Sequence, residues 1–267
     1  MLRRSLAATL VFLILLAVLA KVHQLIQSSS ATPVPDSTPA TRDLTLSPRQ
    51  GDHRRLDPAD FPAGSVPALD SLSRAGVRVR LGAEAERHYL DSLFSGSDST
   101  VRHWRTGDPI AVAIVPGGPR GFLPEMVSEV RQGLDVWSPA AAGLRFLEQN
   151  DTAAADMVIR WTDTLESERA GATDVTWDKA GRIRRVAMFL ATRSPSTGRP
   201  FAPETRQAIV LHELGHALGL PHSSHSEDVM FPVAAATSLT DRDRFSLRLL
   251  YELPTGWIGT PPWRPRR

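Results

Sequence analysis

The chain contains no cysteine and has almost no net charge. The absence of cysteine excludes a disulfide framework, and it excludes any metal site that uses a thiolate ligand. Lysine and arginine total 31 against 29 for aspartate and glutamate, which gives a formal net charge of +2. An excess this small does not indicate the basic stripe of a nucleic-acid-binding protein, so no nucleic-acid partner is expected. Any metal site must therefore rely on histidine and carboxylate ligands.

The N-terminus lacks a long uninterrupted apolar segment but carries a shorter one. Arg3 and Arg4 precede an apolar run over residues 6–20, which Lys21 interrupts. A charged start followed by such a run predicts an export segment over residues 1–26. Two forms of this segment remain open, a cleaved signal peptide and an uncleaved membrane anchor.

An anchor would use residues 6–26, with the lysine amine reaching the membrane interface. The arginine pair favours an N-terminus on the cytoplasmic side, so the rest of the chain is expected outside. The protein is then either membrane-anchored with its catalytic domain outside, or secreted or periplasmic after signal cleavage. Residues 27–65 are rich in Ser, Thr and Pro, which predicts a disordered linker.

The section 66–100 is expected to be ordered, either as a pro-region or as an N-terminal extension packed on the catalytic domain. Val77, Val79 and Leu81 alternate as in a short strand, and residues 83–94 have helical spacing. The chain ends in a Pro- and Arg-rich tail over 257–267.

Residues 101–256 carry the pattern of one α+β domain. Strands are expected at 110–115, 144–147, 156–161 and 184–192, a long helix after Pro124, and a second helix from Pro203 or Glu204 to Leu218. Thr240, followed three residues later by Asp243, predicts a capping box at the start of the last helix.

The second helix carries the pattern HExxHxxGxxH, which begins at His212. Residues four apart lie on nearly the same face of a helix, so His212 and His216 can direct two imidazoles at one Zn²⁺ ion. Glu213 is rotated by about 100° from His212, which places its carboxylate beside the metal rather than on it. This is the position of a general base.

The second half of the pattern supplies a third ligand. Gly219 can end the helix with a positive φ, and Pro221 cannot continue it. His222 then lies where the returning chain can present a third nitrogen; His225 could compete, but the spacing favours His222. Three protein ligands with one open position are typical of a catalytic zinc site, whereas structural sites fill all four positions.

The motif resembles that of the metzincin metallopeptidases, and the residues that follow narrow the resemblance to the matrixins. Met230, in the stretch Ser226–Pro232, matches the methionine of the turn beneath the metal in metzincins. The pair His222–Ser223 and the Leu250–Tyr251 end of the last helix also match. The absence of cysteine behind an N-terminal signal favours a bacterial-type member in the cell envelope.

This resemblance implies a zincin-like α+β fold. A mixed twisted sheet packs with a long helix and the zinc helix, and a small C-terminal subdomain holds the Met-turn and the final helix. It also implies that the last strand before the zinc helix, Val186–Leu190, is a sheet edge that binds peptide or protein substrate as an extended strand. Met230 is expected to be a packing residue.

Three departures from the family limit what can be transferred. Vertebrate matrixins carry a histidine-rich loop that holds a second zinc and calcium, but no histidine lies between Trp161 and Val186 here. Neither a second zinc nor calcium is expected. Many matrixin precursors block the zinc with a cysteine, which this chain lacks. Val233 follows the Met-turn where many matrixins shape the specificity pocket with a tyrosine, so side-chain preference cannot be transferred.

The sequence therefore predicts a monomeric zinc metalloendopeptidase with one catalytic Zn²⁺ ion. His212, His216 and His222 are the expected ligands, and Glu213 is the expected general base. A protease with a single envelope substrate is one alternative. A catalytically silent or latent zinc-bound peptide-binding module is the other.

Overall fold

The structure is a computed structural model that describes residues 69, 71–95, 99–140 and 143–259, all within the unit Gln50–Arg267. The expected export segment, the linker and residues 260–267 of the tail fall outside the described residues. Within the described ranges, no helix is both long enough and apolar enough to cross a membrane.

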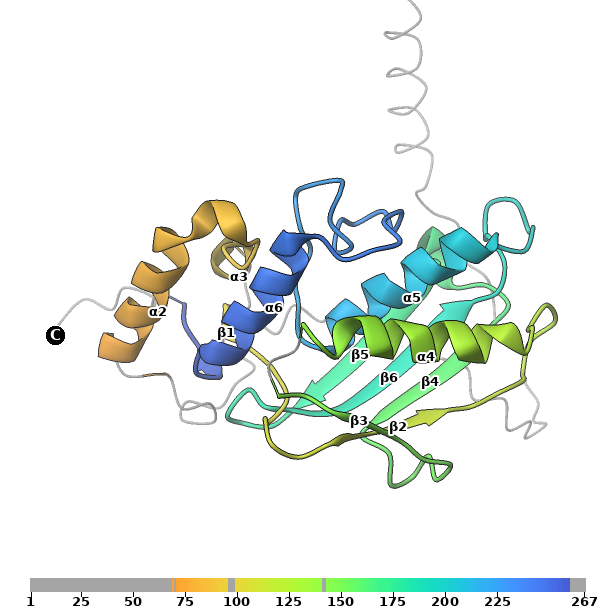
Figure 1. Ribbon diagram of the computed structural model, residues 1–267, viewed down its shortest axis with the longest axis horizontal. Helices are drawn as coiled ribbons and strands as arrows, with labels where there is room; N and C mark the ends of the chain where they lie inside the picture. Colours follow the sequence, from red (N-terminus) through yellow and green to blue (C-terminus); the bar gives the residue numbers. More distant parts are fainter. Residues whose placement is uncertain (1–68, 70, 96–98, 141–142, 260–267) are drawn as a thin grey trace, which may run out of the picture. The chain divides into compact units, whose positions relative to one another are not determined.

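A five-stranded mixed sheet supports the site (Figure 1). Its strands are β2 (Ile110–Ile114), β3 (Phe146–Glu148), β4 (Met157–Thr162), β5 (Gly171–Trp177) and β6 (Ile183–Ala191), in the order β3-β2-β4-β6-β5. β3, β2, β4 and β6 are parallel, and β5 is antiparallel to β6. The expected α+β class and four of the expected strands are confirmed, with boundaries shifted by one or two residues.

The expectation that Val186–Leu190 forms the sheet edge is wrong. These residues lie in β6, which pairs with β4 on one side and with β5 on the other. β5 is the edge strand, and no clear pattern in the sequence predicted it. Its residues GATDVTW are mostly small or polar and half-buried, so they lack the run of large apolar side chains that identified the inner strands.

Two helices lie side by side across one face of the sheet, α4 (Glu125–Trp137) and α5 (Pro203–Ala217) (Figure 1). Both expected helices are therefore confirmed. A side chain at Gly133 would meet Val210 and Leu214, so the absence of a Cβ lets the two helices approach closely. The Trp137 indole N–H donates to the carbonyl of Leu211 at 3.0 Å, which links α4 to the turn of α5 before His212.

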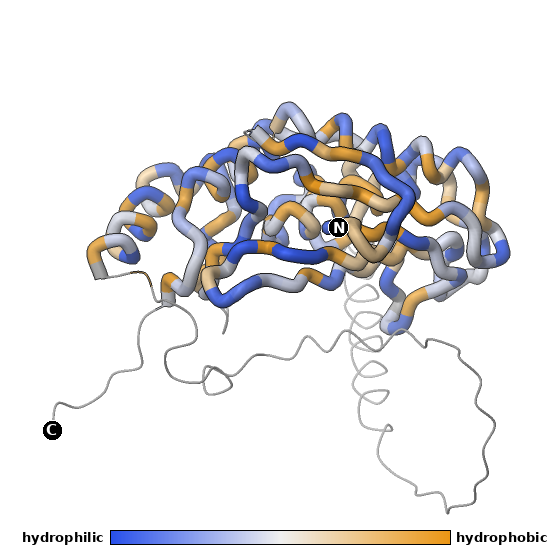
Figure 2. The backbone as a smooth tube through the Cα atoms, turned by 90° about the horizontal axis from the view of Figure 1, so that it is seen from below, coloured by the Kyte–Doolittle hydropathy of each residue, from blue (hydrophilic) through white to orange (hydrophobic). Residues whose placement is uncertain are grey.

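Hydrophilic and hydrophobic residues are interleaved along the backbone of this domain (Figure 2). This pattern is expected where each helix and strand buries one side. The core beneath α4 and α5 includes Met157 and Ile159 of β4 and Val186 and Met188 of β6, all fully buried. The sheet is thus a rigid base for α5.

Residues 71–95 contain no strand, contrary to the expectation for residues 77–81. They form α2 (Ser71–Ala83), the 3₁₀ turn η1 (Ala85–Arg87) and α3 (Ser92–Ser95). Val77 and Leu81 are buried one helical turn apart, whereas Val79 is 73% exposed, so the burial follows the helical period. The helix expected over 83–94 is broken because His88 is extended, with φ −146° and ψ 174°.

This N-terminal segment lies beside α6 (Asp241–Glu252), the last helix (Figure 1). The predicted capping box is confirmed: the Thr240 side chain accepts from the Asp243 N–H, and the Asp243 side chain accepts from the Thr240 N–H. β1 (Thr100–Val101) and β7 (Gly256–Trp257) form a separate antiparallel pair that joins the start and the end of the catalytic region.

Candidate active site

α5 presents two histidines on one face, and both are oriented by backbone carbonyls. The Nδ1 atom of His212 lies 2.8 Å from the carbonyl oxygen of Val229, and that of His216 lies 2.9 Å from the carbonyl oxygen of Leu220. Since a carbonyl can only accept, each Nδ1 must carry the proton. In a neutral ring of this tautomer, Nε2 carries the lone pair that can bind a metal.

α5 ends in a Schellman motif that reverses the chain. The N–H of Leu220 donates to the carbonyl of Gly215 at 3.0 Å, and the N–H of Gly219 donates to that of His216 at 2.9 Å. Gly219 has φ +98°, and a Cβ there would meet the carbonyl of Arg102. Glycine is required at this position for both reasons.

The returning chain carries His222, which is held through its neighbour Ser223. The Ser223 hydroxyl donates to the buried carboxylate of Asp228 at 2.6 Å, and its N–H donates to the carbonyl of Met230 at 2.8 Å. These two bonds tie the loop that carries His222 to the Met-turn.

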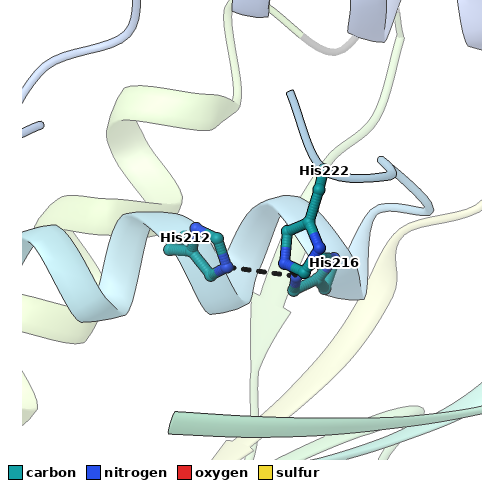
Figure 3. A group of neighbouring side chains, drawn as sticks. All are labelled: His212, His216 and His222. Atoms are coloured by element: carbon teal, nitrogen blue, oxygen red, sulfur yellow. Dashed lines mark hydrogen bonds between the residues drawn. The ribbon is translucent and has the colours of Figure 1, made fainter. Parts of the chain in front are cut away.

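The three imidazoles point toward one another (Figure 3). The Nε2 atom of His216 lies 3.1 Å from the Nε2 atoms of both His212 and His222. With the Nδ1 atoms protonated, the Nε2 atoms of His212 and His216 have no proton to share, so their lone pairs repel unless a cation lies between them. A tetrahedral zinc with Zn–N distances of 2.0–2.1 Å separates its nitrogens by about 3.3 Å. The triad therefore fits zinc.

Across the described part of the chain, these histidines are the one group of three or more His, Asp and Glu side chains close enough to hold a metal. His212 is buried, His216 is half-buried and His222 is exposed, so the site opens to solvent on one side. His225 does not join the group, as the spacing predicts.

Met230 is fully buried and lies against Gly215 of α5. A Cβ at Gly215 would collide with the Met230 sulfur. The absence of a side chain at Gly215, which lies between the two helix histidines, leaves the space that the methionine fills. The expected packing role of Met230 agrees with this position.

The Glu213 side chain points to the edge strand. Its Oε2 atom accepts a hydrogen bond from the Thr173 hydroxyl at 2.6 Å, and a Cβ at Gly171 would overlap its carboxylate. Burial raises the pKa of Glu213 from 4.5 to about 7, against the opposing effects of the Thr173 hydrogen bond and the positive charge of Arg169. A carboxyl with a pKa near neutrality can both take and return a proton.

The sequence of this region matches known metallopeptidases. Residues 202–252 match the model of the matrixin family of peptidases. A stretch of 62 residues is 40% identical to matrix metalloproteinase-2 of Drosophila melanogaster, and this covers 22% of the chain but only 8% of that relative. The match contains α5 and the histidine triad just described. This part of the chain is therefore similar to the matrixin peptidases.

The fold brings together all four residues expected from the motif, but the sequence did not predict several residues that support them. Thr173 and Gly171 contact Glu213 only because β5 pairs at the sheet edge, and β5 itself was missed. The indole N–H of Trp104 and the hydroxyl of Tyr251 donate to the carbonyls of Ala217 and Leu218, which close the end of the zinc helix. Tyr251 was noted as matching the matrixins, but neither its contact nor that of Trp104 was predicted, because each contact joins distant parts of the sequence.

Proposed function

We propose that the protein is a zinc-dependent endopeptidase that cleaves peptide bonds of proteins outside the cytoplasmic membrane. The observation that supports this most directly is the convergence of three imidazole nitrogens at an open site on the helix that also carries Glu213. A binding module requires neither an open coordination position nor a buried carboxyl group beside it.

His212, His216 and His222 would hold the zinc through Nε2. Bound zinc polarises a substrate carbonyl and acidifies water. Glu213 acts as the general base: it takes a proton from the attacking water and gives it to the leaving amine. The Thr173 hydroxyl orients the carboxylate during both transfers, since it donates to Oε2 in the resting structure.

The substrate is proposed to bind along β5 as an added antiparallel or parallel strand. Among the described residues, β5 pairs only with β6, so its other edge can accept backbone hydrogen bonds. Gly171 and Thr173 of this strand contact Glu213 directly, so a peptide along β5 passes beside the general base. This replaces the edge that was expected at Val186–Leu190.

The test uses the purified full chain with casein and with a mixed peptide library, in the presence and absence of a zinc chelator. Glu213→Ala should retain zinc and lose nearly all cleavage. Glu204→Ala removes an exposed carboxylate from the first turn of the same helix and serves as the matched control. Chelator-insensitive cleavage, or full activity in Glu213→Ala, would contradict the proposal. Zinc binding and peptide binding without any cleavage would instead favour the silent peptide-binding module.

The binding mode can be tested on a cleaved peptide from that library. N-methylation of single backbone amides removes one donor at a time, and in a strand only alternate amides face the partner strand. N-methylation should therefore lower the cleavage rate at every second position of the peptide and have little effect at the positions between. An equal effect at all positions, or no effect, would contradict binding along β5.

The proposed location can be tested with a reporter enzyme that is active only outside the cytoplasm, fused after residue 65. Reporter activity should require residues 1–26, in line with the charge and apolar pattern of that segment. Activity that persists when these residues are deleted would contradict export by this route.

A further inference from the structure

Tyr89 joins the N-terminal segment to the last helix of the catalytic region. Its side chain is buried, with 3% exposed. Its hydroxyl donates to the Oδ1 atom of Asp243 at 3.0 Å, and its backbone N–H donates to the Ser246 hydroxyl at 3.3 Å. Burial raises the pKa of Tyr89 well above 10, and the negative charge of Asp243 adds to this effect. The phenol therefore remains a proton donor throughout the physiological pH range.

Asp243 connects Tyr89 to the backbone beside the metal site. The carboxylate is fully buried, and its Oδ2 atom accepts hydrogen bonds from the N–H of Val229 at 3.1 Å and from that of Thr240 at 2.9 Å. The carbonyl of the same Val229 accepts the Nδ1 proton of His212 at 2.8 Å. A continuous set of hydrogen bonds thus runs from Tyr89 to a zinc ligand.

The contacts of the N-terminal segment lie on α6 and its neighbours. Arg80 pairs with Glu252, and the guanidinium of Arg87 lies 4.0 Å from the ring centroid of Phe245. A pro-region that blocks the enzyme must lie over the metal ligands, whereas this segment contacts the opposite end of the hydrogen-bond path. Its removal would take away the Tyr89 hydroxyl and leave a buried carboxylate oxygen of Asp243 without that donor, which is costly.

We propose that residues 71–95 are a permanent part of the catalytic domain, in which Tyr89 is a positioning residue that fixes His212 through Asp243 and Val229. This inference rests on the proposed function only in that the histidine triad must hold zinc. Outer partners of metal ligands commonly change metal affinity by 10–100-fold, and a more distant partner belongs at the lower end of that range.

The test compares zinc affinity in the full chain, measured by competition with a chromophoric chelator. Tyr89→Phe removes one hydroxyl and should weaken zinc binding about tenfold. Arg80→Gln breaks a contact between the same two elements, away from Asp243, and should leave zinc affinity unchanged. The cobalt-substituted proteins provide a second readout, since the visible absorption of bound Co²⁺ reports ligand geometry: Tyr89→Phe should shift it and Arg80→Gln should not.

A double-mutant cycle separates positioning from general loss of stability. In an Asp243→Asn background the added Tyr89→Phe change should alter zinc affinity by less than about twofold, because the path is already altered at Asp243. Additive effects of the two changes, equal effects of Tyr89→Phe and Arg80→Gln, or no effect of Tyr89→Phe would each overturn the proposal. Zinc affinity is measured without substrate. The role of Tyr89 can therefore be tested even if the peptidase assay shows no cleavage.

Discussion

The Thr173 hydroxyl lies 2.6 Å from the Oε2 atom of Glu213, so the edge strand β5 holds the carboxyl group of the zinc helix. The strand that is free to pair with a peptide and the residue assigned as general base are therefore in direct contact. In the proposed function, this pair would link the position of a peptide on β5 to the protonation of Glu213.

Thr173→Val should shift the acidic limb of the pH profile of kcat/KM to higher pH. The hydrogen bond from Thr173 lowers the pKa of Glu213, so its loss raises that pKa, and the deprotonated base is reached only at higher pH. Thr176→Val, on the same strand, is the matched control. A shift to lower pH, or an equal shift in the control, would contradict this role of Thr173.

Gly171→Ala should displace the Glu213 carboxylate and lower kcat/KM by about 100-fold, the size of effect expected for a misplacement of about 1 Å. The added Cβ overlaps the carboxylate, while the three histidines have no part in the clash. Zinc content should remain that of the wild type. Gly76→Ala on α2, where an added Cβ meets no atom within 4 Å, is the control and should keep full activity. Loss of zinc in Gly171→Ala would show a wider disruption instead.

Local sequence predicted the histidine triad but not the surroundings of Glu213, the proposed general base. The triad lies on one helix and its returning chain, so helical period and a glycine at the helix end were sufficient to place all three histidines. The contacts of Glu213 depend on β5, whose pairing with β6 is set by tertiary structure and not by a pattern within Gly171–Trp177. The expected edge at Val186–Leu190 was wrong for the same reason, because a strand that is missed makes its neighbour look like the edge.

The segment before the sheet shows a second limit. Val77, Val79 and Leu81 fit the two-residue period of a strand, but Val77 and Leu81 also fit a helical turn. The segment is helical because a helix buries both Val77 and Leu81, while Val79 lies in solvent. A short apolar stretch next to several arginines does not contain enough residues to distinguish the two periods.

Glu213→Gln should stabilise the zinc-free protein at pH 8 but not at pH 5. The folded-state pKa of Glu213 is about 7 against 4.5 for the free group, so between these values the folded protein keeps a proton that the unfolded chain has lost. Rising pH through this window therefore lowers stability, and the loss is complete above about pH 7. The difference between the two pKa values corresponds to at most about 3 kcal/mol.

Thermal unfolding of the zinc-free wild type and Glu213→Gln at the two pH values measures this effect. Zinc should reduce the difference at pH 8, because a dication on the adjacent histidines favours the ionised carboxylate. If Glu213→Gln were equally stabilised at both pH values, burial of the charged carboxylate would not be the cause of the stabilisation.

His212→Ala and His222→Ala should both abolish tight zinc binding but should differ in the stability of the zinc-free protein. His212 is buried, and its Nδ1 proton satisfies the carbonyl of Val229, so its loss leaves a cavity and an unpaired acceptor at a cost of about 1–3 kcal/mol. His222 is exposed, and truncation of an exposed side chain usually changes stability by no more than about 0.5 kcal/mol. Zinc binding by competition and thermal unfolding in chelator measure the two quantities separately. If the two zinc-free variants were equally stable, the hydrogen bond to Val229 would not be holding His212 in place before zinc binds, and the metal itself would have to order the ligand.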